Sequence, residues 1–237
     1  LRRYAEMFPP ESIELPPWPE DEFDESAPER NRVLKRMLDI SQDSEADVRG
    51  AISTYYAMTR FVDDGVGQIL DALDQLDLTD NTIVVFTADH GDFMGEHGMI
   101  VKGGVFYDSL TRVPLIISYP GEVPSNEVDS SMVNTIDIIP TLLRLQGIEA
   151  PPEMQGESLP TVTDASPRDE AFSEYGAGGL QYTMADLEKL PEPYGYPTLI
   201  QNLWAREAEG RRKMVRTSEW KYVHDSMGDL DELYDLV

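Results

Sequence analysis

An aspartate and a histidine stand side by side at positions 89 and 90, directly after a run of mostly apolar residues at 82–87. The run reads Thr-Ile-Val-Val-Phe-Thr and predicts a strand buried in a parallel sheet. Open α/β sheets bind ligands beyond the carboxyl ends of their strands. Asp89 and His90 are therefore candidate ligands of a divalent cation. The alternative is an aspartate turn beside a hydrogen-bonded structural histidine.

The donor atoms of Asp89 and His90 do not identify the metal. Carboxylate oxygen favours hard cations such as Ca²⁺ and Mg²⁺, and imidazole is also accepted by Mn²⁺ and Zn²⁺. The chain contains no cysteine, which excludes thiolate metal sites, cysteine nucleophiles and disulfides. The spacing thus predicts half of a metal site with oxygen and nitrogen donors.

Two further residues in the glycine-rich segment after His90 could take part in chemistry. Lys102 is one of five lysines in the chain and precedes two glycines. Its ammonium could bind a sulfate or phosphate oxygen, or a charged leaving group, as a point charge. A solvated loop lysine is the alternative. His97 could contact a substrate or supply a proton, or it could be a structural loop histidine.

The composition limits the classes of function. The 237 residues include 45 acidic and 19 basic side chains, and the formal net charge is -26. This argues against nucleic acid or an anionic membrane surface as a partner, because phosphate binding needs clustered Lys and Arg. No apolar run approaches the ~18 residues of a membrane span. A surface rich in acids and poor in lysine favours a protein kept soluble at high salt, where self-repulsion is screened.

Periodicity predicts the elements that must position the candidate residues. A proline-rich acidic segment at 4–30 predicts an extended loop on a domain surface, with a disordered arm as the alternative. Asp43 or Ser44 can cap a long amphipathic helix that reaches Leu76 and breaks near Gly65.

A second buried strand is predicted at 113–118, and a further helix begins near Asp137 and ends at Gly147. Beyond Pro151 the sequence changes to loops and short strands. The strands are predicted at 171–175, 213–217, 220–224 and 232–236, with a glycine- and proline-rich stretch at 176–197.

Together these elements predict an α/β fold with a mostly parallel sheet flanked by helices and a small C-terminal antiparallel-sheet subdomain. Three units are expected along the chain. Residues 1–42 form a surface loop and a short helix, 43–160 the α/β core, and 161–237 the small α+β subdomain.

In this order the residues resemble the sulfatase family of the alkaline-phosphatase superfamily. The resemblance covers residues 4–237 and is most specific at 55–147. The stretches that carry it are 55–57 (Tyr-Tyr-Ala), 62–64 (Val-Asp-Asp), 67–70 (Gly-Gln-Ile-Leu), 82–92 (Thr-Ile-Val-Val-Phe-Thr-Ala-Asp-His-Gly-Asp), 95–98 (Gly-Glu-His-Gly), Lys102, 112–117 (Arg-Val-Pro-Leu-Ile-Ile), 120–121 (Pro-Gly), 137–143 (Asp-Ile-Ile-Pro-Thr-Leu-Leu), 215–222 (Val-Arg-Thr-Ser-Glu-Trp-Lys-Tyr) and 232–236 (Glu-Leu-Tyr-Asp-Leu).

The resemblance implies an incomplete alkaline-phosphatase-like fold and a site for sulfate-ester hydrolysis. Asp89 and His90 would be metal ligands, with calcium the first expectation and magnesium or manganese the alternatives. Lys102 would contact the transferred sulfuryl group or the leaving oxygen, and His97 the substrate. The substrate would be a small-molecule or saccharide sulfate ester. Residues 7–16 look like the substrate-side loop of choline-sulfatase and iduronate-sulfatase relatives.

In this family the nucleophile is a formylglycine hydrate made from Cys or Ser in a C/S-x-P-x-R motif near the N-terminus. Residues 26–30 (Ser-Ala-Pro-Glu-Arg) fit the motif literally. However, they lie in an acidic loop on the wrong side of the long helix and lack the Thr-Gly that usually follows. We therefore expect this chain to be the C-terminal part of a sulfatase, inactive alone, with the nucleophile and further ligands in an N-terminal part.

Two other functions stay open at this point. The same residues suit phosphonate or phosphate monoester hydrolysis, because sulfuryl and phosphoryl oxygens make similar demands on lysine and metal. A non-catalytic domain that binds an anion is the third reading. A missing part would also expose a sheet edge and an apolar face, which predicts self-association of the chain alone.

Overall fold

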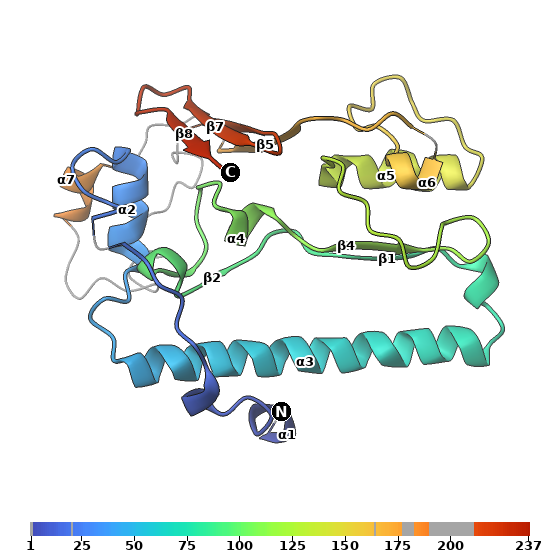
Figure 1. Cartoon of the computed structure of the whole chain (residues 1–237), viewed down its shortest axis with the longest axis horizontal. Helices are drawn as coiled ribbons and strands as arrows, with labels where there is room; N and C mark the ends of the chain where they lie inside the picture. Colours follow the sequence, from blue (N-terminus) through green and yellow to red (C-terminus); the bar gives the residue numbers. More distant parts are fainter. Residues whose placement is uncertain (1, 20, 164, 177–182, 190–210) are drawn as a thin grey trace.

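The computed structural model describes residues 2–19, 21–163, 165–176, 183–189 and 211–237. One long helix, α3, runs along one side, and a two-stranded ribbon lies beside it (Figure 1). Helix α5 lies on the opposite side of the ribbon from α3, and the C-terminal sheet lies near α5 and α2 (Figure 1). Among the helices described, none is both long and apolar enough to cross a bilayer.

The N-terminal segment consists largely of short helical turns and bends, and the extended loop predicted at 4–30 is found only in part, at 13–19. Helix α1 spans Arg2–Ala5 and the 3-10 turn η1 spans Pro10–Ser12. Ile13 is buried against the first turns of α3 in a small apolar cluster with Ile40, Val48 and Ile52. The acidic stretch then leads into helix α2, Glu29–Leu38.

Helix α3 spans Glu45–Gln75 without interruption, so the predicted break near Gly65 is wrong. Ser44 caps the helix and accepts a hydrogen bond from the Asp47 amide at 3.2 Å. A single glycine inside a helix lowers its stability by about 1 kcal/mol relative to alanine. That cost is too small to break a helix of 31 residues.

The two apolar strands of the predicted core form an antiparallel ribbon. Strand β1, Val84–Thr87, pairs with β4, Leu115–Ser118, after the short 3-10 turn η2, Thr79–Asn81. The expected mostly parallel sheet is not found, because all strand pairs in the described ranges are antiparallel. Residues 88–114 return as a loop, without the long helical crossover that parallel neighbours need.

The loop between β1 and β4 holds the main core. It contains β2 (Phe93–Met94), the turn η3 (Glu96–Gly98), β3 (Ile100–Val101) and helix α4 (Asp108–Thr111). Strands β2 and β3 pair antiparallel. Fully buried Phe93 and Met99 pack there against Leu34 and Leu38 of α2.

Helix α5 spans Ile138–Leu145, close to the prediction, and follows the turn η4, Thr135–Asp137. Asp137 is fully buried and its carboxylate accepts the amides of Asn134 and Glu157. Helix α6 follows at Pro160–Thr163.

The C-terminal sheet has the predicted antiparallel strands in the order β5-β6-β7-β8. They span Ala171–Tyr175, Arg212–Arg216, Trp220–Asp225 and Glu232–Asp235. The short helix α7, Met184–Leu187, lies against α2. Most of the predicted loop at 176–197 falls outside the described residues, which there comprise 176 and 183–189.

Candidate functional site

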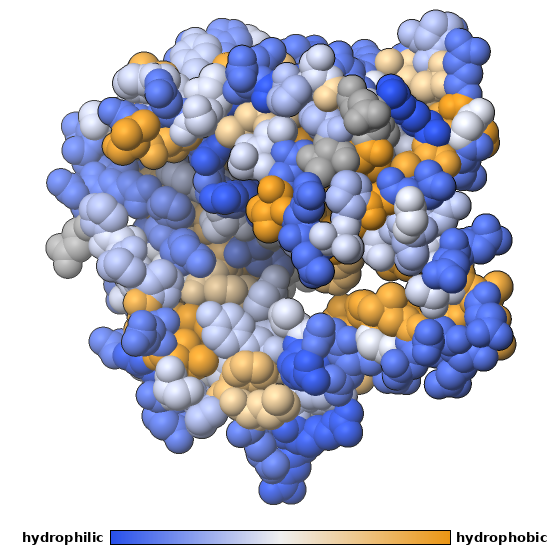
Figure 2. All heavy atoms as spheres, turned by 45° about the vertical axis from the view of Figure 1, so that its right-hand side comes forward, coloured by the Kyte–Doolittle hydropathy of each residue, from blue (hydrophilic) through white to orange (hydrophobic). Residues whose placement is uncertain are grey.

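A large open cavity lies between the end of the β1–β4 ribbon, the C-terminal sheet and the segment before α5. Its volume is about 1640 Å³. Asp89, His90 and Lys102 all line it. Figure 2 shows the molecule hollowed between its upper and lower parts, with hydrophobic side chains at the margin. The structure therefore brings three of the four predicted site residues to one cavity.

Asp89 and His90 converge at the carboxyl end of β1. The His90 amide donates a hydrogen bond to Asp89 Oδ1 at 3.0 Å, and His90 Nε2 lies 3.5 Å from Asp89 Oδ2. That backbone hydrogen bond and the imidazole hold the pKa of Asp89 below its usual value, and the charge of Lys102 adds to this. Asp89 is exposed and remains ionised at neutral pH.

The orientation of the His90 ring suits a metal ligand. Nδ1 lies 2.9 Å from the Gly91 carbonyl oxygen, which can only accept, so Nδ1 carries the proton. A neutral ring in this tautomer presents the lone pair of Nε2 beside Asp89 Oδ2. Two ligands at about 2.3 Å and right angles around one cation would lie about 3.3 Å apart. The donor pair therefore fits one divalent cation.

The pair is only part of a coordination sphere. In the described ranges, no group of three or more His, Asp or Glu residues is arranged to hold a metal. Half of a metal site at Asp89 and His90 thus stays a prediction, and further ligands would have to come from outside the described residues.

Lys102 directly follows strand β3, whose last residue has a strained backbone. The preceding Val101 has φ 74°, a left-handed conformation that is rare for a β-branched residue and costs about 1–3 kcal/mol. Gly103 packs so closely on Leu34 that a side chain there would collide with it. The exposed ammonium of Lys102 makes no hydrogen bond within the described part of the chain. It is available to an anion.

His97 is not brought to the cavity with the other three. Its ring stacks on Tyr107 with centroids 3.9 Å apart, and Nδ1 lies 2.6 Å from Glu22 Oε1. The left-handed backbone at this residue, φ 58°, turns the ring toward these partners. A role for His97 toward substrate stays a prediction, and these contacts favour the structural alternative.

Residues 26–30 fit the S-x-P-x-R motif literally, but their serine, Ser26, lies outside the cavity. Ser26 Oγ donates to Asp24 Oδ1 at 2.6 Å on the surface, and Pro28 precedes the first residue of α2. Ser26 does not line the cavity. This placement supports the view that the segment begins a helix and is not a nucleophile motif.

An ion cluster that the sequence analysis did not single out fastens the site loop to the C-terminal sheet. Arg216 Nη1 donates to both oxygens of Asp108, at 2.6 and 2.7 Å. Lys221 Nζ donates to Asp108 Oδ1 at 2.5 Å and to the Phe106 carbonyl at 3.0 Å. Burial alone would raise the pKa of Asp108, but the hydrogen bond from Lys221 and the charges of Lys221 and Arg216 lower it overall.

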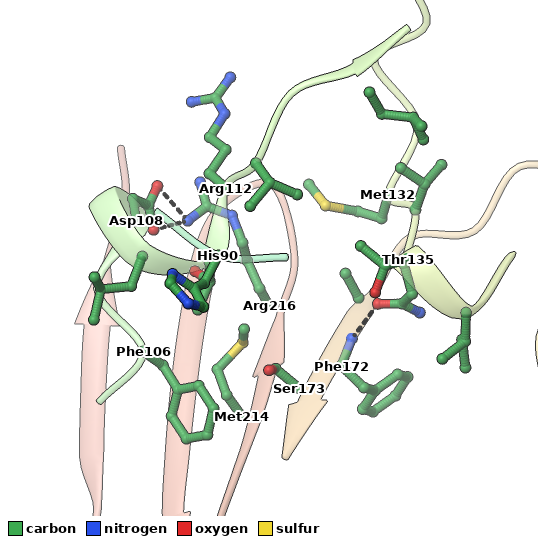
Figure 3. A pocket seen from close by; sticks show the side chains of 18 of the residues that line it. His90, Phe106, Asp108, Arg112, Met132, Thr135, Phe172, Ser173, Met214 and Arg216 are labelled. Carbon is green, nitrogen blue, oxygen red and sulfur yellow. Dashed lines mark hydrogen bonds and ion pairs between the residues drawn. The ribbon is translucent and has the colours of Figure 1, made fainter. Parts of the chain in front are cut away.

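Figure 3 shows how the walls of the cavity face one another. His90 lies beside the Asp108–Arg216 pair, with Phe106 and Met214 next to it. Thr135, Met132 and the start of β5 at Phe172 form the opposite wall. The Phe172 amide donates to Asn134 Oδ1 at 2.9 Å, which ties the two parts of that wall together. The cavity is thus ionic on one side and mixed apolar and polar on the other.

Solved structures define the class of fold. The phosphonate monoester hydrolase SpPMH from Silicibacter pomeroyi matches with a TM-score of 0.78 and 24% identity, over 98% of this chain and 46% of that one. BT4656, solved in complex with its substrate D-glucosamine-2-N,6-O-disulfate, matches with a TM-score of 0.64 and 28% identity, over 87% of this chain and 38% of that one. The fold is that of the alkaline-phosphatase-like hydrolases.

The family model described as Sulfatase matches residues 8–148. Arylsulfatase K of Mus musculus is 32% identical over 196 residues, which are 81% of this chain and 32% of that protein. The N-acetylglucosamine-6-O-sulfatase of Bacteroides thetaiotaomicron is 32% identical over 190 residues, 77% of this chain and 29% of the relative. The chain belongs to the sulfatase family, as its motifs predicted.

The match is to part of each relative. The chain spans about a third of the length of the curated relatives named above. The ulvan-active sulfatase of Formosa agariphila, 30% identical over 229 residues, matches 96% of this chain and 37% of its own length.

Proposed function

We propose that the intact protein hydrolyses sulfate esters and that this chain supplies part of the metal site, one cationic group and a wall of the substrate cavity. The observation that carries the proposal is the convergence of Asp89 and His90 at the end of β1, with Lys102 close enough to influence the charge of Asp89. Membership of the sulfatase family and the names of the relatives support the reaction class.

Each residue has a separate task in this proposal. Asp89 and His90 would hold a divalent metal, with calcium the first choice and magnesium or manganese the alternatives. Such a metal, when bound, polarises an oxygen of the sulfuryl group. Lys102 places a positive charge toward the transferred group or the leaving oxygen, where negative charge develops. The nucleophile, expected to be a formylglycine hydrate, would come from a part of the protein outside this chain.

The cavity supports a substrate of saccharide size. Its volume of about 1640 Å³ exceeds the roughly 300–1,000 Å³ of common small-molecule pockets. Apolar side chains such as Phe172 and Met132 beside polar Thr135 can cover a sugar ring and its hydroxyls. We therefore propose a small-molecule or saccharide sulfate ester as the substrate.

Phosphonate or phosphate monoester hydrolysis is the second candidate function. The likeness to a phosphonate monoester hydrolase at a TM-score of 0.78 is a likeness of fold at 24% identity. Lysine and metal would serve a phosphoryl oxygen as they serve a sulfuryl oxygen. A non-catalytic anion-binding domain is less well supported, because it gives no reason for Asp89, His90 and Lys102 to converge.

The test compares 4-nitrophenyl sulfate with 4-nitrophenyl phenylphosphonate as substrates of the intact protein. We expect a higher kcat/KM for the sulfate ester. Lys102→Ala should lower kcat by about 10²-fold, the usual effect of losing one charge-stabilising donor. The matched control is Lys189→Ala, since Lys189 is exposed, pairs with Asp186 and does not line the cavity.

The outcomes separate the candidates. A higher kcat/KM for the phosphonate ester would favour the second function. No turnover of either ester, together with no binding of Ca²⁺, Mg²⁺ or Mn²⁺ in a calorimetric titration, would favour the non-catalytic reading. Equal activities of the Lys102 and Lys189 variants would contradict the role of Lys102.

A further inference from the structure

Arg112 lies at the same end of the ribbon as Asp89 and His90. Thr87 pairs with Leu115 at the last step of the β1–β4 ladder. Beyond it, the Gly91 amide donates to the Leu110 carbonyl at 2.9 Å. His90 and Arg112 lie on the two short segments between these contacts. Arg112 also lines the cavity that contains His90 and Lys102.

The guanidinium of Arg112 is available to an external anion. Three of the five basic side chains that line the cavity are engaged within the chain, namely Arg30, Arg168 and Arg216. Arg112 and Lys102 form no side-chain hydrogen bond or ion pair in the ranges that the structure describes. Carboxylates outnumber basic groups 45 to 19 in this chain, so the lack of a partner does not reflect a shortage of acids.

The backbone that carries Arg112 is held in place while its side chain is not. Arg112 directly follows helix α4, and its amide donates to the Asp108 carbonyl at 2.9 Å. The Asp108 side chain is in turn fixed by Arg216 and Lys221. Figure 3 shows the Arg112 side chain extending away from the Asp108–Arg216 pair. An arginine anchored at its backbone and open at its guanidinium is arranged for binding.

We infer that Arg112 is a substrate-binding residue that selects esters carrying a second anionic group, a sulfate or a carboxylate, beside the ester that is cleaved. The inference rests on the proposed function, in which Lys102 and the Asp89–His90 pair receive the reacting sulfate. A guanidinium offers two parallel N–H donors that match the oxygens of sulfate and carboxylate. Arg112 lines the same cavity as His90 and Lys102 and is a separate cation from Lys102, so it would contact another group of the same substrate.

The experiment compares two probes on the intact protein, N-acetyl-D-glucosamine 6-sulfate and D-glucosamine-2-N,6-O-disulfate. Affinity is measured by calorimetry and turnover by sulfate release, for the native protein, Arg112→Ala and Arg112→Lys. Arg112→Ala should lower the ratio of disulfate to monosulfate affinity about tenfold or more, as expected for a lost charge-assisted hydrogen bond. Arg112→Lys should restore part of the ratio of disulfate to monosulfate affinity, because lysine keeps the positive charge but lacks the two parallel N–H donors of the guanidinium.

Arg144→Ala is the control, since Arg144 of helix α5 is exposed like Arg112 but does not line the cavity. It should leave the ratio unchanged. An equal loss of both affinities in Arg112→Ala, with turnover of the native protein intact, would overturn the inference and leave the proposed function standing. A ratio that falls in Arg112→Ala, with no turnover of either probe by the native protein, would support the inference and count against the proposed function.

Discussion

The Gly91 carbonyl decides which nitrogen of His90 can bind a metal. It accepts a hydrogen bond from Nδ1–H and so leaves Nε2 as the only basic nitrogen of the neutral ring. Hydrogen bonds of this kind fix the tautomer and orientation of many metal-binding histidines. The Asp89 carboxylate lies on the Nε2 side, where a cation would sit between the two donors.

We therefore predict that His90→Gln weakens divalent-metal binding by the intact protein at least tenfold, because an amide replaces the imidazole donor. Calorimetric titration with Ca²⁺ checks this. His224→Gln is the matched control, since that histidine lies near the end of β7 against Asp231 and does not line the cavity. Equal affinities of both variants would show that His90 is not a ligand.

Residues at the strand end were predictable, and residues that act across the fold were not. Asp89 and His90 were singled out because a buried strand followed by polar residues marks a ligand-binding edge. Lys102 was singled out because it is one of five lysines and precedes two glycines. Asp108 and Arg216 are 108 positions apart, and nothing in a local pattern links them. Arg112 was visible only as part of a motif, since its place in the cavity depends on how the segments at the end of the β1–β4 ribbon come together.

Helix α4 couples the C-terminal sheet to the site loop through one carboxylate. Asp108 is shared by Arg216 and by Lys221, whose side chain is 6% exposed. Removing the carboxylate leaves the buried ammonium of Lys221 beside the Arg216 guanidinium, without the negative charge of Asp108 between them. Breaking a fully buried pair costs roughly 3–5 kcal/mol. Asp108 itself is 39% exposed, so solvent screening lowers the expected cost to about 2 kcal/mol.

Asp108→Asn should thus lower the free energy of unfolding by about 2 kcal/mol at pH 7. The pKa of Asp108 is lowered in the folded state, so its contribution is present above the unfolded pKa of about 3.9 and is lost as the pH falls through the folded value. Urea unfolding from pH 7 to pH 3 should show the difference between variant and native protein shrinking below about pH 4. Asp80→Asn, in the exposed turn η2, is the control. If the difference in unfolding free energy between variant and native protein grew on acidification, it would contradict a stabilising role for the contacts of Asp108 with Arg216 and Lys221.

A second prediction at this scale concerns the unbroken helix α3. Gly65 lies inside it, and a Cβ added there would meet open space. Gly65→Ala should raise the free energy of unfolding by about 0.5–1 kcal/mol, because alanine loses less backbone entropy in a helix. Gly91→Ala provides the contrast, since its Cβ would collide with the Ser109 carbonyl. A destabilising Gly65→Ala in chemical denaturation would indicate the helix break that the sequence suggested.

Element types were largely predictable, and their partners were not. The C-terminal strands were found within one or two residues because alternating and β-branched residues lie between clear turns. The direction of pairing between β1 and β4 was missed, since a continuous apolar strand reads the same in parallel and antiparallel sheets. Periodicity also could not show that Gly65 is tolerated within a long helix.

The described chain leaves much apolar surface uncovered. Phe61 and Ile69 of α3 are 52% and 62% exposed, Ile116 of β4 is 61% exposed and Ile139 of α5 is 54% exposed. The strands predicted to be buried are therefore only partly covered by the described part of the chain. Large apolar patches of this kind mark surfaces that associate with other protein.

We predict that residues 1–237 produced alone self-associate, and more strongly at high salt. Screening weakens the repulsion between chains of formal charge -26 without weakening apolar contacts. Sedimentation velocity at low and high salt measures this. Ile116→Lys should reduce association at little cost in stability, because that side chain is already exposed. A well-folded chain that stays monomeric at high concentration would contradict the prediction.

The Asp108–Lys221 contact joins residues 113 positions apart, and this separation has a consequence for biosynthesis. Ribosomes add about 5–20 residues per second, so Lys221 is made roughly 6–23 s after Asp108. During that interval the nascent chain contains Asp89, His90 and Arg112, but it lacks the Lys221 contact that holds Asp108 and the site loop in place. The site loop can therefore reach its final geometry only after Lys221 has left the ribosome.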